Sequence, residues 1–255
     1  MLPVDHPLAP ATYGVLLVGL IAVLVTRAIR KDRREYQRFK RYRTTRRRQA
    51  LYRKWLIESF AWFGGSALVV LLLVWPYLPL MLEEVDHWPA VSAFHDLLEE
   101  GGALAQWLIG GGSLALLAVI TLSVFLARNA TEQVPTIGDI HALLPRNRAE
   151  LRFGALLSVN AGVVEELLFR LALPVLIFAV VGDAFAAVVA SVLVFGLLHA
   201  YQGAPGLIAS LVVGAILMAI FLLTGSILWP IIVHALFDLR SLVLIPVVVY
   251  RVHEK

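Results

Sequence analysis

A small set of ionisable residues stands inside hydrophobic segments of this 255-residue sequence. It forms three groups, with Glu165, Glu166 and Arg170 in VVEELLFR, His199 in FGLLHA, and His234, Asp238 and Arg240 in IIVHALFDLR. An ionisable side chain costs several kcal/mol in a hydrocarbon core, so such residues are expected to be functional unless a partner explains them. Carboxylates and imidazoles are the usual groups of general acid–base catalysis. The three groups therefore predict a proton-transfer site assembled from three separate helices.

Helical spacing gives the two neighbouring glutamates different roles. Residues four apart lie on one face of a helix, whereas adjacent residues point about 100° apart. Glu166 can therefore pair with Arg170 and neutralise two buried charges, while Glu165 points elsewhere without a local partner. We predict that Glu165 is a general base and that Glu166 is mainly structural. The alternative is that both glutamates only lock helices together.

The two histidines need partners of different origin. His234 and Asp238 are four apart, so the carboxylate can accept a hydrogen bond from one ring nitrogen and leave the other for substrate or water. His199 has no carboxylate at helical spacing, and we expect Glu165 to approach it from another helix. A single histidine of this kind is as often a packing residue. Three helices that each carry such a group favour a catalytic site.

Other protease signatures are absent from the sequence. It contains no HExxH, which places two zinc ligands and a base on one helix, and no GxSG serine or GxGD aspartyl motif. The chain has no Cys, which excludes disulfides, thiol catalysis and cysteine metal sites. What remains is a Glu and two His residues on different helices.

This ordered set resembles the CAAX protease and bacteriocin-processing (CPBP, or Abi) family of intramembrane proteases, including CAAX prenyl protease 2-like members. The family motifs are EExxxR, FxxxH and HxxxN or HxxxD, in that order. They stand here as Glu165-Glu166-x3-Arg170, Phe195-x3-His199 and His234-x3-Asp238. The segments LLPRNRAELRF and GSILWPIIVH also look like that family, so the resemblance covers about residues 137–239.

The resemblance implies a glutamate-type protease in which Glu165 and His199 activate a water molecule. It also implies that His234 and Asp238 stabilise the tetrahedral intermediate. Asp238 stands where the prenyl-protease branch has Asn, and an ionised Asp cannot donate to an oxyanion, so we expect Asp238 to orient His234 instead. Leu171 departs from the Gly that many members have after the Arg. We expect no cofactor, although Glu165, His199 and His234 are side chains that zinc accepts.

Composition identifies the elements that must position these residues. Hydrophobic residues make up 60% of the chain, charged residues only 16%, and the mean hydropathy is +0.81. A run of about 20 apolar residues is long enough to cross a membrane as a helix. Such runs are predicted at residues 11–29, 57–82, 103–127, 151–181, 184–200, 207–223 and 227–249, with Pro174 kinking or ending the fourth. The predicted fold is therefore an all-α polytopic transmembrane bundle of about seven, at most eight, spans.

The distribution of charge predicts the topology. Of the 22 Lys and Arg residues, 14 lie within residues 27–54, directly after the first span, whereas residues 83–102 carry six acidic residues and no Lys or Arg. The positive-inside rule then places 30–54 inside, 83–102 and the N-terminus outside, and the C-terminus inside. Straight spans with these bounds put His199 and His234 at different depths, so tilted or shorter helices are needed to bring them together.

The basic stretch has two main interpretations. It is either a cytoplasmic loop that fixes topology, or a helix whose Tyr36, Phe39 and Tyr42 lie on anionic lipid. We expect anionic lipid as a partner of residues 27–54 and no nucleic acid, because the charge is local. A short amphipathic interfacial helix is also predicted at residues 137–147.

We divide the chain into a two-span N-terminal region, 1–102, and a protease core, 103–255, with its motifs at 165–238. The predicted function is cleavage of a membrane-associated peptide or protein by a multi-pass protein of a cytoplasmic (inner) membrane. A catalytically silent immunity or scaffold protein is the first alternative, and a proton-coupled transporter the second, although the sequence shows none of the inverted repeats typical of transporters. Prenylated tails, bacteriocins and sorting tails all stay open as substrates.

Overall fold

The computed structural model describes residues 3–127 and 141–254, with only the backbone for parts of one helix, and every regular element in these ranges is a helix. The all-α prediction is confirmed. The α-helices are α1 Ala9–Thr26, α2 Arg33–Phe39, α3 Thr45–Ser59, α4 Gly65–Val74, α5 Tyr77–Asp86, α6 Pro89–Glu100, α7 Gly102–Ala127, α8 Arg148–Glu166, α9 Leu173–Val181, α10 Ala184–Leu198, α11 Gly203–Thr224, α12 Leu228–Leu239 and α13 Ile245–Val248.

In the described ranges, four short π-helical segments join pairs of these helices into long rods. They are η1 Arg27–Asp32, η2 Phe60–Gly64, η4 Leu167–Ala172 and η6 Arg240–Leu244. Among the described residues, four helices are long and apolar enough to cross a membrane, at Ala9–Phe39, Thr45–Val74, Ala200–Thr224 and Leu228–Val248, and the apolar helix Ala184–Leu198 is shorter. The chain therefore has the character of a multi-pass membrane bundle, while the count of seven spans stays a prediction.

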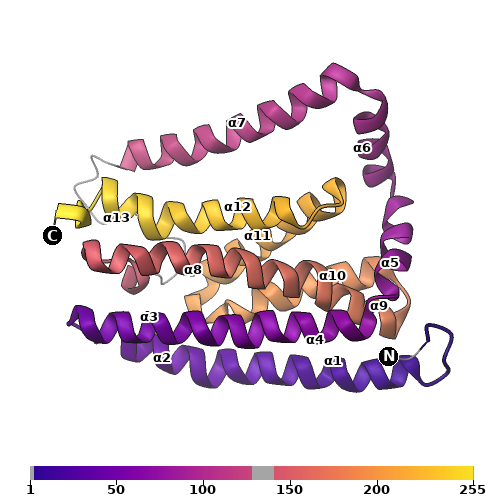
Figure 1. Ribbon diagram of the computed structural model, residues 1–255, viewed down its shortest axis with the longest axis horizontal. Coiled ribbons are helices and arrows are strands. Elements are labelled where there is room, and N and C mark those ends of the chain that lie inside the picture. Colours follow the sequence, from indigo (N-terminus) through magenta and orange to yellow (C-terminus); the bar gives the residue numbers. More distant parts are fainter. Residues whose placement is uncertain (1–2, 128–140, 255) are drawn as a thin grey trace.

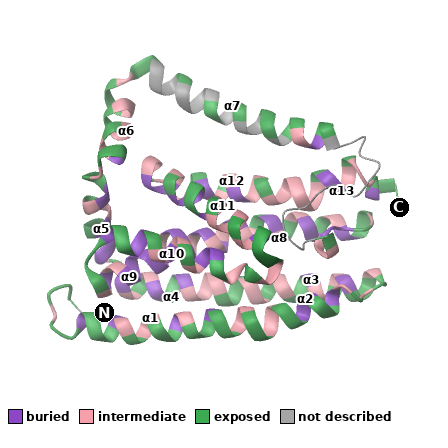
Figure 2. Ribbon diagram, turned by 180° about the vertical axis from the view of Figure 1, so that it is seen from behind, coloured by how far each residue is buried: buried purple, intermediate pink, exposed green. Residues whose placement is uncertain are grey.

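The rods run side by side along the long axis of the molecule (Figure 1). The turn between α2 and α3 lies at the same end as the C-terminus, whereas α5, α6 and the start of α1 lie at the opposite end. Figure 2 shows buried residues gathered where rods meet and exposed residues on the outward faces. Exposed side chains there include large apolar ones such as Val15, Leu68 and Ile216, as expected for helices that contact lipid.

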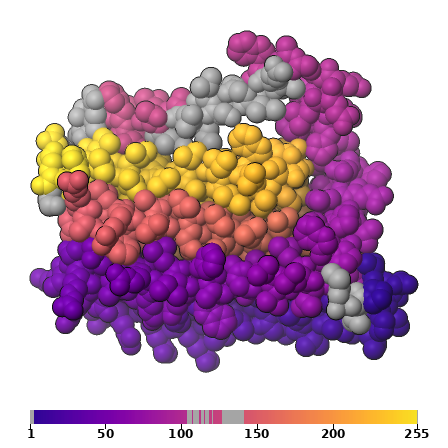
Figure 3. All heavy atoms as spheres, viewed as in Figure 1, coloured from indigo at the N-terminus to yellow at the C-terminus, as the bar shows by residue number. Residues whose placement is uncertain are grey.

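The N-terminal rods pack directly on the rest of the chain. Figure 3 shows the second rod against α8; helix α3 makes this contact, while α1 contacts α9. One buried apolar cluster includes Tyr13 of α1, Val70 of α4, Leu176 of α9 and Phe221 of α11. The division of the chain at residue 102 stays a prediction, but the two regions share one core.

The fourth predicted span neither ends nor breaks at Pro174. The helix continues from α8 through η4 and α9 and ends at Gly182, whose φ of +68° is typical of a helix C-terminus. Proline lacks an N–H and its ring crowds the carbonyl four residues earlier, here that of Arg170. The π-helical segment Leu167–Ala172 lies directly before Pro174, and widening of the helix there accommodates the proline.

The basic stretch is mostly helix, so its prediction as a loop was wrong. The first rod continues to Phe39, the second begins at Thr45, and only residues 40–44 connect them. Tyr36 and Phe39 are buried against protein, which contradicts the prediction that their face lies on lipid. Most arginines of the stretch are exposed, and lipid binding at residues 27–54 stays a prediction that rests on them.

A buried ion pair fastens the second rod to the start of α8. Arg48 Nε donates to Glu150 Oε2 at 3.0 Å, and both side chains are buried. Arg48 Nη2 also donates to the Tyr52 hydroxyl and to the carbonyls of Ala142 and Leu144. A buried charge is tolerated when it is paired and hydrogen-bonded. This arginine of the basic stretch is therefore a structural residue.

The predicted interfacial helix at residues 137–147 was wrong for the part that is described. Residues 137–140 lie outside the described ranges. Within 141–147 only the single 3₁₀ turn His141–Leu143 forms, and Leu144 and Pro145 are buried. Asn147 then caps α8, because its side-chain oxygen accepts from the Glu150 N–H.

Helices α8 and α12 approach each other closely at Gly162. A Cβ added there would lie 2.9 Å from the Ile231 carbonyl oxygen and 3.0 Å from the Ala235 Cβ. Small residues of this kind let helix backbones come together in membranes. The contact sets the spacing of the two helices that carry Glu166 and His234.

We expect Gly162→Ala to destabilise the protein by about 1–3 kcal/mol, because the added methyl group overpacks this contact. The thermal unfolding midpoint in detergent measures the effect. Gly19→Ala is the matched control, since a Cβ on Gly19 meets nothing within 4 Å. An unchanged midpoint for Gly162→Ala would show that the two helices separate freely.

The topology can be tested with single cysteines, because the chain has none of its own. We expect a membrane-impermeant maleimide, applied from outside, to label Glu99→Cys and to leave Arg47→Cys unlabelled until the membrane is opened. Both positions are exposed, and they lie at opposite ends of the bundle. Equal labelling of the two from one side would contradict the predicted topology.

Candidate active site

Straight membrane spans would place His199 and His234 at different depths, and the short helix α10 removes this difference. Helix α10 has 15 residues, about 22 Å, which is less than a hydrocarbon core of about 30 Å. The chain turns through η5, Ala200–Gln202, and reverses into α11 at Gly203, whose φ is +81°. His199 therefore stands at the end of a helix that stops partway along the bundle, and not at the bundle's end.

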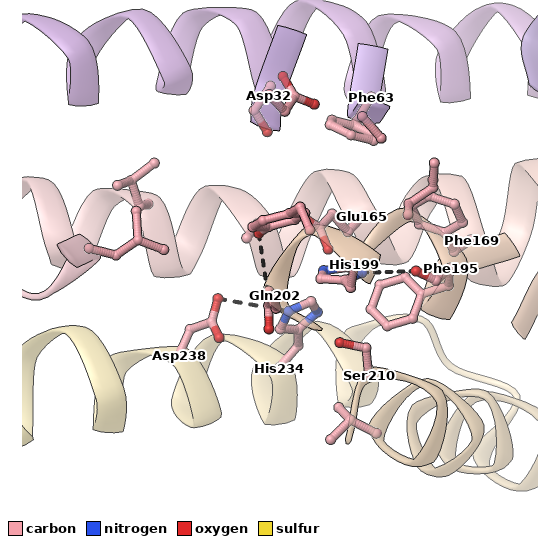
Figure 4. Close-up of a pocket in the computed structure, with 18 of the residues that line it drawn as sticks. Asp32, Phe63, Glu165, Phe169, Phe195, His199, Gln202, Ser210, His234 and Asp238 are labelled. Carbon is pink, nitrogen blue, oxygen red and sulfur yellow. Dashed lines mark hydrogen bonds and ion pairs between the residues drawn. The ribbon is translucent and has the colours of Figure 1, made fainter. Parts of the chain in front are cut away.

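Four of the predicted site residues converge on one cavity of about 620 Å³. Glu165 from α8, His199 from the end of α10, and His234 and Asp238 from α12 all line it (Figure 4). The predicted convergence of these side chains is confirmed. Glu166 and Arg170 do not line the cavity and are fully buried behind it.

The predicted pair between Glu166 and Arg170 is confirmed. Arg170 Nε lies 2.9 Å from Glu166 Oε2, and Arg170 Nη2 donates to Glu166 Oε1 at 3.2 Å. The Arg170 guanidinium also packs 4.6 Å from the ring centroid of Phe195. Two charges that would each be costly alone are therefore held together under the cavity.

The carboxylate that holds His234 is Glu166, so the prediction that Asp238 orients this ring was wrong. His234 Nδ1 lies 2.7 Å from Glu166 Oε1, whereas His234 Nε2 lies 3.8 Å from Asp238 Oδ2, too far for a hydrogen bond. Glu166 and His234 are 68 residues apart. No local spacing could reveal this contact, which depends on the close packing of α8 and α12.

His199 is oriented by its own helix. Its Nδ1 donates to the Phe195 carbonyl at 2.8 Å, which leaves Nε2 as the acceptor of the neutral ring. Its ring also packs on Phe195 at 4.7 Å and on Tyr201 at 6.2 Å between centroids. Glu165 and His199 face the same cavity, and no direct hydrogen bond joins them in the described structure. A water molecule between them is therefore the arrangement to consider.

Residues 147–240 match the family model described as type II CAAX prenyl endopeptidase Rce1-like. The CAAX protease resemblance is confirmed. The match begins at the residue that caps α8, ends just after α12, and includes all six predicted site residues. No curated protein and no solved structure matches the chain.

The Rce1-like segment does not supply the whole cavity. Arg27, Asp32 and Tyr36 from the first rod and Trp55 and Phe63 from the second complete its wall. Figure 4 shows Asp32 and Phe63 on the N-terminal helices, across the cavity from His234. The sequence interpretation missed Arg27 and Asp32, because it counted both among the charged residues of the basic stretch 27–54 that follows the first apolar run. The available signal was the apolar run before Arg27, because the helix that begins in this run continues to Phe39 and carries both residues.

Arg240, the last ionisable residue of the third group, does not line the cavity. Its Nε donates to Ser123 Oγ of α7 at 2.7 Å, so this arginine joins two helices.

Within the described ranges no group of three or more His, Asp or Glu side chains is arranged to hold a metal ion. We therefore derive no step through zinc.

Proposed function

We propose that this chain is an intramembrane endopeptidase in which Glu165 and His199 activate water to hydrolyse a peptide bond in or near the bilayer. The observation that carries the proposal is the convergence of Glu165, His199, His234 and Asp238 on one cavity among apolar helices. The Rce1-like match over these residues supports the reaction class.

The first step of the proposed reaction deprotonates water. Glu165 accepts a proton, while Nε2 of His199 accepts a hydrogen bond from the same water and orients it, since Nδ1 is already committed to the Phe195 carbonyl. The oxygen attacks the carbonyl carbon of the scissile bond. When the C–N bond breaks, Glu165 returns its proton to the leaving nitrogen, so the carboxylate is restored for the next turnover.

His234 is proposed to stabilise the oxyanion. Its Nδ1–H donates to Glu166, so Nε2 is the nitrogen that faces substrate, and it donates when the ring is doubly protonated. The two positive charges of this ring and Arg170 would then face the two negative charges of Glu166 and Asp238. Asp238 contributes charge beside Nε2 and no donor to the oxyanion.

The proposed substrates are membrane-associated peptides or proteins. The name of the matching family points to prenylated C-terminal tails, and bacteriocins and sorting tails are the other candidates. The proposed location is a cytoplasmic (inner) membrane.

The proposal is tested with the full-length protein reconstituted in liposomes. It is incubated with a farnesylated peptide that ends in a CAAX box, and with the same peptide without the farnesyl group. Mass spectrometry should detect two fragments from at least one peptide, at a rate that follows enzyme concentration. Folded protein that cleaves neither these peptides nor a panel of apolar transmembrane peptides would favour the catalytically silent alternative.

A further inference from the structure

Arg27 lies outside the Rce1-like segment and yet lines the candidate active-site cavity. It is the first residue of η1 in the N-terminal rod, and its side chain is only 9% exposed. The guanidinium carbon lies 5.9 Å from the Trp62 ring and 6.0 Å from the Phe63 ring. A cation is therefore placed at the cavity wall beside two aromatic rings.

Two nearby carboxylates compensate the positive charge of Arg27, but the guanidinium does not form hydrogen bonds with them. Its Nε lies 3.6 Å from Asp32 Oδ2 and its Nη2 lies 3.7 Å from Glu58 Oε2, both too long for hydrogen bonds. Glu58 is already bonded to Lys31. Within the described structure the buried Nε has no hydrogen-bond partner. Buried donors are nearly always satisfied, so this one indicates an acceptor that is bound during function.

We infer that Arg27 binds a backbone carbonyl oxygen of the peptide substrate. A neutral carbonyl supplies the missing acceptor without bringing a third negative charge beside Asp32 and Glu58, as a substrate carboxylate would. An extended peptide presents a carbonyl at every residue, and the cavity wall that holds Arg27 continues to Glu165 and His199. This inference rests on the proposed endopeptidase function. It makes the N-terminal rod part of the substrate-binding site.

The test is a double-mutant cycle in which one change is made in the protein and the other in the peptide substrate. Arg27→Met removes the donors, and peptides with a single thioamide weaken one carbonyl acceptor at a time along the chain. With wild-type protein, one thioamide position should lower kcat/KM about 10- to 100-fold, mainly through a higher KM. Arg27→Met should show that loss with the parent peptide and no further loss with that thioamide.

Two variants guard the interpretation. Arg30→Gln changes an exposed cation of the same segment that does not line the cavity, and it should keep the wild-type thioamide response. If Arg27→Met alone fails to fold, the double variant Arg27→Met/Asp32→Asn removes both partners of the ion pair and replaces it in the cycle.

Three results would overturn the inference. Arg27→Met could respond to every thioamide as wild type does, which would make Arg27 structural. Amidation of the peptide C-terminus could instead weaken cleavage by wild type and have no effect on Arg27→Met, which would identify the terminal carboxylate as the ligand. The same cycle measured as peptide binding to the Glu165→Gln protein is independent of cleavage. A missing Arg27 effect there contradicts this inference, whereas normal binding without cleavage by wild type contradicts only the endopeptidase function.

Discussion

Glu165→Gln should lower kcat about 10²- to 10⁴-fold while leaving the unfolding midpoint within about 2 °C of wild type. The amide has nearly the same shape as the carboxylate but cannot take a proton from water. Because Glu165 lines the cavity and forms no ion pair in the described structure, its charge contributes little to packing. Rates are measured in liposomes with the peptide that wild type cleaves, and folding is followed by thermal unfolding.

The partner of Glu165 gives a second measure of the same step. His199→Ala should cause a loss of similar size, and the double variant should be little worse than either single one, since the two groups act on one water molecule. Glu99→Gln is the matched control, because this exposed glutamate lies at the far end of the bundle. Glu165→Gln protein that retains wild-type kcat would remove the general base from the mechanism.

Glu166→Gln should impair both stability and rate, and stability at least as strongly. Removing one charge from the buried pair leaves Arg170 without its partner, at a cost of about 3–5 kcal/mol. The same change loosens the carboxylate contact of His234, which should lower kcat about 10- to 100-fold. The unfolding midpoint and kcat of the purified protein measure the two effects.

A paired substitution separates the two roles of Glu166. Glu166→Gln/Arg170→Met removes both charges and should recover much of the lost stability, but not the lost rate, because His234 still lacks its carboxylate. A stable, fully inactive Glu166→Gln protein beside an active Glu165→Gln protein would reverse the roles assigned to the two glutamates.

The sequence by itself determined the features that depend on local spacing and composition. Apolar runs predicted the helical bundle, and four-residue spacing predicted the pair between Glu166 and Arg170. The ordered motifs predicted the family resemblance that the match over residues 147–240 bears out, and four of the side chains that line the cavity. These properties follow from helix periodicity and from the cost of ionisable groups in hydrocarbon.

Only the tertiary structure decided which groups touch across helices. Gly162 brings α8 against α12, so Glu166 and not Asp238 holds His234. The end of α10 at Leu198 brings His199 to the depth of the cavity. Extension of the first rod through η1 places Arg27 in the cavity wall. Each of these contacts joins residues far apart in the chain, and it is set by helix length and by how closely two backbones approach, which local periodicity does not encode.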